Sequence, residues 1–80
     1  MKEEQILNYR FDIEGNKYWF NSAGLRHRDN DLPAIENVNG NKYWYQNGRL
    51  HRDNDKPSIE RTNGTKEWWN NDVFVRITGL

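Results

Sequence analysis

One sequence of roughly 25 residues occurs twice in succession in this chain, and this repeat constrains the fold more than any other feature. Residues 15–39 read GNKYWFNSAGLRHRDNDLPAIENVN, and residues 40–63 read GNKYWYQNGRLHRDNDKPSIERTN. A third, partial copy begins at Gly64 with GTKEWWNND. Repeats of this length indicate stacked supersecondary units, because one unit alone cannot bury its apolar face.

The repeat boundaries predict a single domain over residues 1–80. Its parts are an N-terminal cap at 6–14, repeat 1 at 15–39, repeat 2 at 40–63, and a partial repeat 3 with the C-terminal cap at 64–80. Residues 1–5 are expected to form a frayed start. A chain of 80 residues makes one domain with a thin core.

Short turn sequences separate the apolar runs of the chain. Asn-Gly pairs stand at 39–40, 47–48 and 63–64, and this pair is the strongest local signal of a two-residue hairpin turn. No helical periodicity runs through the sequence. We therefore predict an all-β protein, an antiparallel meander of β-hairpin repeats in a single curled sheet. The expected strands are 6–13, 17–21, 25–28, 34–38, 41–46, 49–52, 58–62, 65–69 and 73–77.

Repeat 1 has one residue more than repeat 2 between its tryptophan and its histidine. The extra residue falls within 22–24, where a bulged turn absorbs it. Two registers stay open for repeat 1, because Leu25 and Arg26 stand in the reverse order of Arg49 and Leu50.

Aromatic side chains at fixed spacing provide the core of a chain in which only 34% of residues are hydrophobic. Trp19, Trp44 and Trp68 are equivalent in the three copies, and we expect them to form a stacked row on one face. The neighbouring aromatic residues point to the opposite face: Tyr18, Phe20, Tyr43, Tyr45 and Trp69. A sheet with apolar groups on both faces must curl, be covered or meet a partner.

The pattern of repeat 2 resembles a known repeat family. Residues 44–60 read WYQNGRLHRDNDKPSIE, and this is similar to the W-Y-x-N-G-x-L-H-R-x-D-G-P-A-x-E repeat of MORN-like proteins of phages and bacteria. The resemblance covers about residues 15–76. It departs at Asp31-Leu32 and Asp55-Lys56, where the family has Asp-Gly, and at Val75, where the third copy lacks the histidine.

This resemblance implies a β-hairpin array that is used for binding. It further implies a phage-encoded protein with an anti-defence role, an inhibitor of a bacterial host or defence complex, for example of the CRISPR type. Such a protein acts in the host cytosol.

The His-Arg-Asp-Asn-Asp segments at 27–31 and 51–55 carry the residue types that catalysis or metal binding would use. They lack the six or more oxygen ligands of a calcium loop and the four ligands of a structural zinc site. No nucleophile stands beside either histidine. We therefore expect no enzyme, no metal and no cofactor. The aspartates are expected to cap their own turns, the arginines to pair with these aspartates or with glutamates across the strands, and the histidines to lie at the surface. In an alternative interpretation, His27, Arg28, His51 and Arg52 grip an anionic nucleotide.

Charge and composition narrow the classes of partner. Twelve basic and twelve acidic residues cancel, so no basic field attracts nucleic acid, although aromatic residues among lysines and arginines keep nucleic acid open as a weaker alternative. The absence of cysteine fits a reducing compartment and predicts a cytoplasmic protein. No apolar run approaches the ~18 residues of a membrane span, so no membrane partner is expected.

A non-catalytic protein-binding module is the leading interpretation. Strand 73–77 is an apolar sheet edge with a single charge and no proline, and such an edge invites a further strand. We expect a second copy, giving a homodimer, or a target protein to dock there, and the remaining alternative is a structural subunit that self-assembles. The candidate binding residues are Tyr43, Tyr45, Trp69, Phe74, Val75, His27, Arg28, His51 and Arg52.

Overall fold

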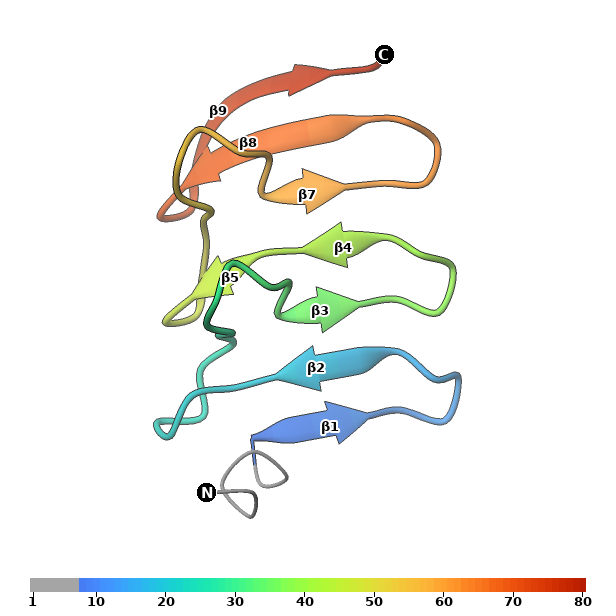
Figure 1. Cartoon of the computed structure of the whole chain (residues 1–80), viewed down its shortest axis with the longest axis vertical. Helices are drawn as coiled ribbons and strands as arrows, with labels where there is room; N and C mark the ends of the chain where they lie inside the picture. The colour runs from blue at the N-terminus through green and yellow to red at the C-terminus, as the bar shows by residue number, and fades with distance from the viewer. Residues whose placement is uncertain (1–7) are drawn as a thin grey trace.

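The computed structural model describes residues 8–80 as an antiparallel β-meander, and the described part of the chain contains no helix (Figure 1). The predicted all-β class is confirmed. Seven strands form one sheet in sequence order: β1 (Tyr9–Phe11), β2 (Lys17–Trp19), β3 (Ile35–Glu36), β4 (Lys42–Tyr43), β7 (Ile59–Glu60), β8 (Lys66–Asn70) and β9 (Val73–Thr78). A separate hairpin pairs β5 (Tyr45–Gln46) with β6 (Arg49–Leu50). The sheet is open, with β1 and β9 at its two ends, in a molecule of 40 × 26 × 17 Å.

The strands before β8 are shorter than the sequence predicts, whereas β8 has the predicted length and β9 extends one residue beyond the predicted 73–77. Residues 25–28 form no strand and make only an isolated bridge between Phe20 and Arg26. The predicted strand 41–46 is divided, because Tyr43 belongs to the main sheet whereas Tyr45 pairs with Leu50 in the small hairpin. The expected frayed start at 1–5 and the first residues of the cap, 6–7, lie outside the described residues.

The turns that join β1 to β2, β3 to β4 and β7 to β8 lie along one edge of the sheet (Figure 1). The long loops and the turn between β8 and β9 lie along the other. Each of the three turns along the first edge is closed by the N–H of a glycine, as in the 2.9 Å bond from Gly40 N to Asn37 O. Gly40 has a φ of 102°, and a Cβ there would lie 2.8 Å from the methyl group of Thr62. That turn therefore requires glycine.

The structure decides the register of repeat 1. Arg26 takes the place of Leu50, since it bridges Phe20 as Leu50 pairs with Tyr45. Leu25 takes the place of Arg49, so the extra residue lies in the turn at 22–24, and Leu25 remains 46% exposed. Its carbonyl accepts a 2.8 Å hydrogen bond from Asn21 N, which closes the wider turn.

Large and small side chains alternate across the buried row of the sheet. Trp19 N donates to Ala34 O at 2.8 Å, and Trp44 N donates to Ser58 O at 2.8 Å. Ala34 and Ser58 are fully buried and Trp44 is 4% exposed. Because β3 lies between β2 and β4, the tryptophans stand two strands apart, about 9.6 Å. Trp19, Trp44 and Trp68 therefore occupy equivalent positions in a row, as expected, but their rings do not stack on one another.

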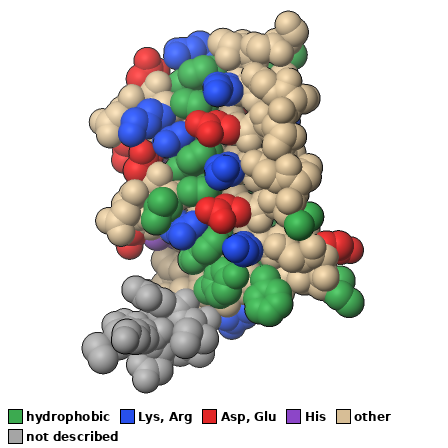
Figure 2. Space-filling model, turned by 45° about the vertical axis from the view of Figure 1, so that its right-hand side comes forward, with side chains coloured by type: hydrophobic (Ala, Val, Ile, Leu, Met, Phe, Trp, Pro, Cys, Tyr) green, Lys and Arg blue, Asp and Glu red, His purple; other side chains and the backbone are tan. Residues whose placement is uncertain are grey.

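A second row on the sheet consists of charges of alternating sign. The cross-strand pairs are Lys17–Glu36, Glu36–Lys42, Lys42–Glu60 and Glu60–Lys66. Each opposite-charge pair contributes roughly 0.2–1 kcal/mol, and a two-residue slip of an inner strand would separate its partners. Figure 2 shows basic and acidic side chains alternating beside a column of hydrophobic side chains.

Candidate functional site: the arginine–tryptophan clamps

Each repeat places an arginine guanidinium on the ring of its tryptophan. The distances from the guanidinium carbon to the ring centroid are 3.6 Å for Arg28 on Trp19, 3.8 Å for Arg52 on Trp44 and 4.2 Å for Arg76 on Trp68. These are cation–π contacts in which the arginines cover the tryptophan face of the sheet. In the first two repeats the arginine lies in the long loop, whereas Arg76 lies on β9 directly opposite Trp68.

The long loops turn sharply at Asp-Asn-Asp. Asn30 and Asp31 have φ angles of 66° and 59°, and Asn54 and Asp55 repeat them at 64° and 55°. Asparagine and aspartate tolerate this left-handed conformation better than other residues with side chains. The second aspartate of each turn thereby faces the next repeat.

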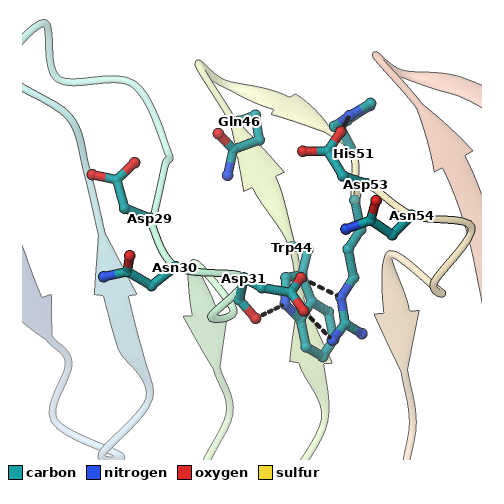
Figure 3. A pocket seen from close by; sticks show the side chains of 9 residues that line it. Asp29, Asn30, Asp31, Trp44, Gln46, His51, Asp53 and Asn54 are labelled. Atoms are coloured by element: carbon teal, nitrogen blue, oxygen red, sulfur yellow. Dashed lines mark hydrogen bonds and ion pairs between the residues drawn. The ribbon is translucent and has the colours of Figure 1, made fainter.

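Asp31 binds repeat 2 through both its carbonyl and its carboxylate (Figure 3). Trp44 Nε1 donates to the Asp31 carbonyl at 3.0 Å. Arg52 donates from Nε and Nη2 to the two carboxylate oxygens at 2.9 and 3.2 Å, and Lys56 Nζ adds a bond of 2.8 Å. The hydrogen bonds from Arg52 and Lys56 lower the pKa of the Asp31 carboxyl to about 2. We call this arrangement of one aspartate on one arginine–tryptophan pair a filled clamp.

Asp55 makes the corresponding contacts with the third copy. Its carbonyl accepts a 3.0 Å hydrogen bond from Trp68 Nε1, and its carboxylate lies 3.5 Å from Arg76 Nη2. The same clamp therefore joins repeat 2 to the C-terminal segment, with a looser ion pair.

The two histidines tie each loop to the following hairpin. His27 Nδ1 accepts from Asn47 N at 3.0 Å, and its Nε2 lies 2.8 Å from Asp29 Oδ1. His51 repeats this with Asn71 N at 3.3 Å and Asp53 at 2.7 Å. An Nδ1 that accepts leaves the proton on Nε2, so both rings fit the neutral tautomer. Only 17% and 18% of the two side chains is exposed, and the expected surface position is therefore wrong.

A hollow of about 160 Å³ lies between the two Asp-Asn-Asp turns (Figure 3). The polar groups on its wall already bind one another: Arg52 binds Asp31, and Gln46 Nε2 donates to Arg28 O at 2.9 Å. Ligand pockets usually measure roughly 300–1,000 Å³. Over residues 8–80, no three histidine, aspartate or glutamate side chains gather as metal ligands.

The candidate binding residues fall into separate groups in the structure. His27, Arg28, His51 and Arg52 belong to the clamps just described. Phe74 packs edge-on against Trp69 with ring centroids 5.4 Å apart, and Phe74 and Val75 are 49% and 53% exposed. Tyr43 lies opposite Ile35 on β3 and Ile59 on β7. Tyr45 lies in the small hairpin.

Sequence reasoning predicts that the arginines pair with the aspartates of the turns or with glutamates across the strands, and such pairs are present. It misses the contacts of Asp31 and Asp55 with the tryptophan of the following copy, and it places Arg76 only in the edge strand. The available signal was the spacing from tryptophan to arginine, which is nine residues in the first copy and eight in the second and third.

Comparisons of the chain with protein-family models, with curated proteins and with solved structures found no match. Over residues 8–80, no helix has the length and hydrophobicity needed to cross a membrane.

Proposed function

We propose that this protein is a non-catalytic module that binds another protein through the C-terminal edge of its sheet. The observation that carries the proposal is the exposure of apolar side chains on β9: 64% for Val73, 49% for Phe74 and 53% for Val75. Strand β9 is six residues long and pairs only with β8. An unpaired apolar edge of this length is a template for a strand from another chain.

The charge distribution on β9 supports the same proposal. Arg76 is the one charged residue of the strand, and it is drawn toward Trp68 and Asp55. Its charge therefore does little to deter a further strand, unlike the lysines that protect many sheet edges. A second copy of the chain is an alternative occupant, because two β9 strands related by a two-fold axis would pair antiparallel.

The contacts of the His-Arg segments favour a binding protein over an enzyme. Both histidines and Arg52 are held by neighbouring repeats, so they are not poised around a substrate cavity. The same contacts argue against the alternative function of binding and sequestering an anionic nucleotide, because a nucleotide site needs free cationic groups.

The identity of the partner rests on the resemblance to MORN-like repeats. We propose a host-directed role in the bacterial cytosol, such as inhibition of a defence complex. This role is proposed by analogy with the family, whereas the exposed apolar edge of β9 supports protein binding in general.

The test replaces Phe74 and Val75 with lysine in the full chain. Sedimentation should show that the double variant has lost any self-association of the parent protein. Capture from bacterial lysate should show that it no longer binds the parent's partner. A variant with Ile13→Lys and Val38→Lys is the matched control, because both side chains are exposed, at 98% and 69%, and lie away from β9.

Because Phe74 packs on Trp69, the pair Val73→Lys and Val75→Lys serves as a second variant that leaves this ring contact intact. A monomeric parent that keeps the same partner in both double variants would contradict the proposal.

A further inference from the structure

The first arginine–tryptophan pair has the same inner contacts as the second. Arg28 Nη1 donates to Pro33 O at 3.1 Å and to Glu36 at 3.0 Å. Arg52 Nη1 donates to Pro57 O and to Glu60, both at 3.1 Å. The two guanidinium groups are therefore held in the same way, one on Trp19 and the other on Trp44.

The outer contacts differ between the two pairs. Arg52 uses Nε and Nη2 for the carboxylate of Asp31, and Trp44 uses its indole N–H for the Asp31 carbonyl. For Arg28 Nε and Nη2 and for Trp19 Nε1, residues 8–80 supply no acceptor. The Arg28 side chain is 23% exposed against 12% for Arg52.

In this sequence no Asp-Asn-Asp turn stands before the first arginine–tryptophan pair. Strand β1 stands in the position of β3 and β7, because Phe11 pairs with Lys17 as Glu36 pairs with Lys42. In the interior repeats, an Asp-Asn-Asp turn and a proline precede that strand. The sequence before β1, MKEEQILN, contains neither aspartate nor proline.

We propose that Arg28 and Trp19 form a binding site for an acidic turn of a partner protein. The carboxylate of an aspartate in that turn binds Arg28 Nε and Nη2 side by side, and its main-chain carbonyl accepts from Trp19 Nε1. The filled clamp of Asp31 on Arg52 and Trp44 displays this ligand chemistry within the same molecule. The site lies at the opposite end of the sheet from β9, so it goes beyond the proposed function and does not depend on it.

The donors of the site select for this ligand. Two parallel N–H groups of an arginine match the two oxygens of a carboxylate. The indole N–H donates to a neutral carbonyl oxygen, an acceptor that a turn carries and an inorganic anion does not. Glu36 lies on the adjacent Nη1, and its negative charge disfavours a doubly charged phosphate more than a singly charged carboxylate.

The chain's own turns are occupied elsewhere. Asp31 is held by Arg52 and Lys56, and Asp55 by Trp68 and Arg76. A second copy would have to break one of these contacts to fill the Arg28 site. The ligand is therefore a turn of a different protein.

The test follows the indole N–H of Trp19 and the Nε–H of Arg28 by nuclear magnetic resonance in the full chain. The probe is a cyclic peptide with the sequence Asp-Asn-Asp-Leu-Pro of residues 29–33, closed by glycine. We expect the two signals to shift on addition of the peptide, while the indole signals of Trp44 and Trp68 stay in place. A peptide with asparagine in place of both aspartates should bind at least tenfold more weakly.

Two variants sharpen the test. Arg28→Lys keeps the positive charge but loses the paired donors, so it should weaken binding of the peptide at least tenfold. An unchanged Trp68 signal in this variant shows that the chain is folded. Glu3→Gln with Glu4→Gln should leave the Trp19 signal of the free protein unchanged.

Three results would overturn the proposal. The first is an unmoved Trp19 signal at millimolar peptide, and the second is inorganic phosphate binding as tightly as the acidic peptide. The third is a Trp19 signal that moves in the Glu3/Glu4 variant, which would assign the site to the chain's own N-terminal residues.

Discussion

Asp31 in repeat 1 and Arg52 in repeat 2 are joined by two hydrogen bonds of 2.9 and 3.2 Å, one to each carboxylate oxygen. They are 21 residues apart in the sequence, and Arg52 lies on the ring of Trp44, which in turn donates to the Asp31 carbonyl. One residue thus binds both members of the next repeat's pair. The contact between repeats therefore includes directed hydrogen bonds as well as apolar packing.

Replacement of Asp31 with asparagine should lower the free energy of unfolding by about 1 kcal/mol, because a bidentate ion pair that is partly exposed to solvent is lost. Asp29→Asn is the matched control, since the Asp29 side chain is 81% exposed and its carboxylate binds only His27 in the described structure. Urea denaturation of both variants measures the difference. Equal losses in the two variants would show that the clamp contributes nothing of its own.

The lowered pKa of Asp31, about 2, predicts an acid-sensitive term in the stability. A carboxyl whose pKa is lower in the folded than in the unfolded state stabilises the fold above its ordinary pKa of 3.8. That contribution is lost as the pH falls from about 4 to about 2. Urea denaturation at several pH values should show a smaller loss of stability over this window in Asp31→Asn than in the parent. Parallel pH profiles would contradict the assignment.

Trp44→Ala should cost about 3–5 kcal/mol and unfold most of the protein, because Trp44 is the most buried tryptophan and a domain of this size has little stability to spare. His51→Ala should cost about 1–2 kcal/mol, since the ring makes two hydrogen bonds and is mostly buried. Thermal unfolding of the two variants tests the order. If the free energy of unfolding of the His51 variant lies within about 0.5 kcal/mol of that of the parent, His51 behaves as the surface residue that the sequence predicts.

Ser58→Ala should destabilise the protein by about 1–3 kcal/mol. The hydroxyl of Ser58 is fully buried, donates to Trp69 O and accepts from Trp69 N, both at 2.9 Å. Its loss leaves two backbone groups unpaired at the irregular step in β8. The exposed Ser22→Ala provides the control, and indistinguishable melting temperatures for the two variants would count against this role.

The repeat, the Asn-Gly turns and the equivalent tryptophans were sufficient to predict the antiparallel meander. These signals are local, because a two-residue turn and the alternation along a strand involve neighbouring residues. The missing strand at 25–28 has a local cause as well. The extra residue within 22–24 widens the turn and leaves only the bridge between Phe20 and Arg26.

The clamps could not be predicted from the same signals. Alternation shows that Trp44 faces one side of the sheet, but it does not show what covers that side. The cover comes from two loops: one carries Asp31 of the preceding repeat, and the other carries Arg52 of the same repeat as Trp44. Such contacts depend on the left-handed turn at Asn30 and Asp31, where most sequence patterns predict only an exposed loop.

Hydrogen exchange of the indole N–H groups distinguishes the clamps on Trp44 and Trp68, which the preceding repeat fills, from the pair of Arg28 and Trp19, to which residues 8–80 supply no aspartate. The Trp44 indole donates to Asp31 O in a buried setting, and the Trp19 indole has no acceptor among residues 8–80. We predict that the Trp44 indole exchanges at least tenfold more slowly than that of Trp19, with Trp68 between them. Equal exchange at Trp19 and Trp44, or slower exchange at Trp19, would contradict this account.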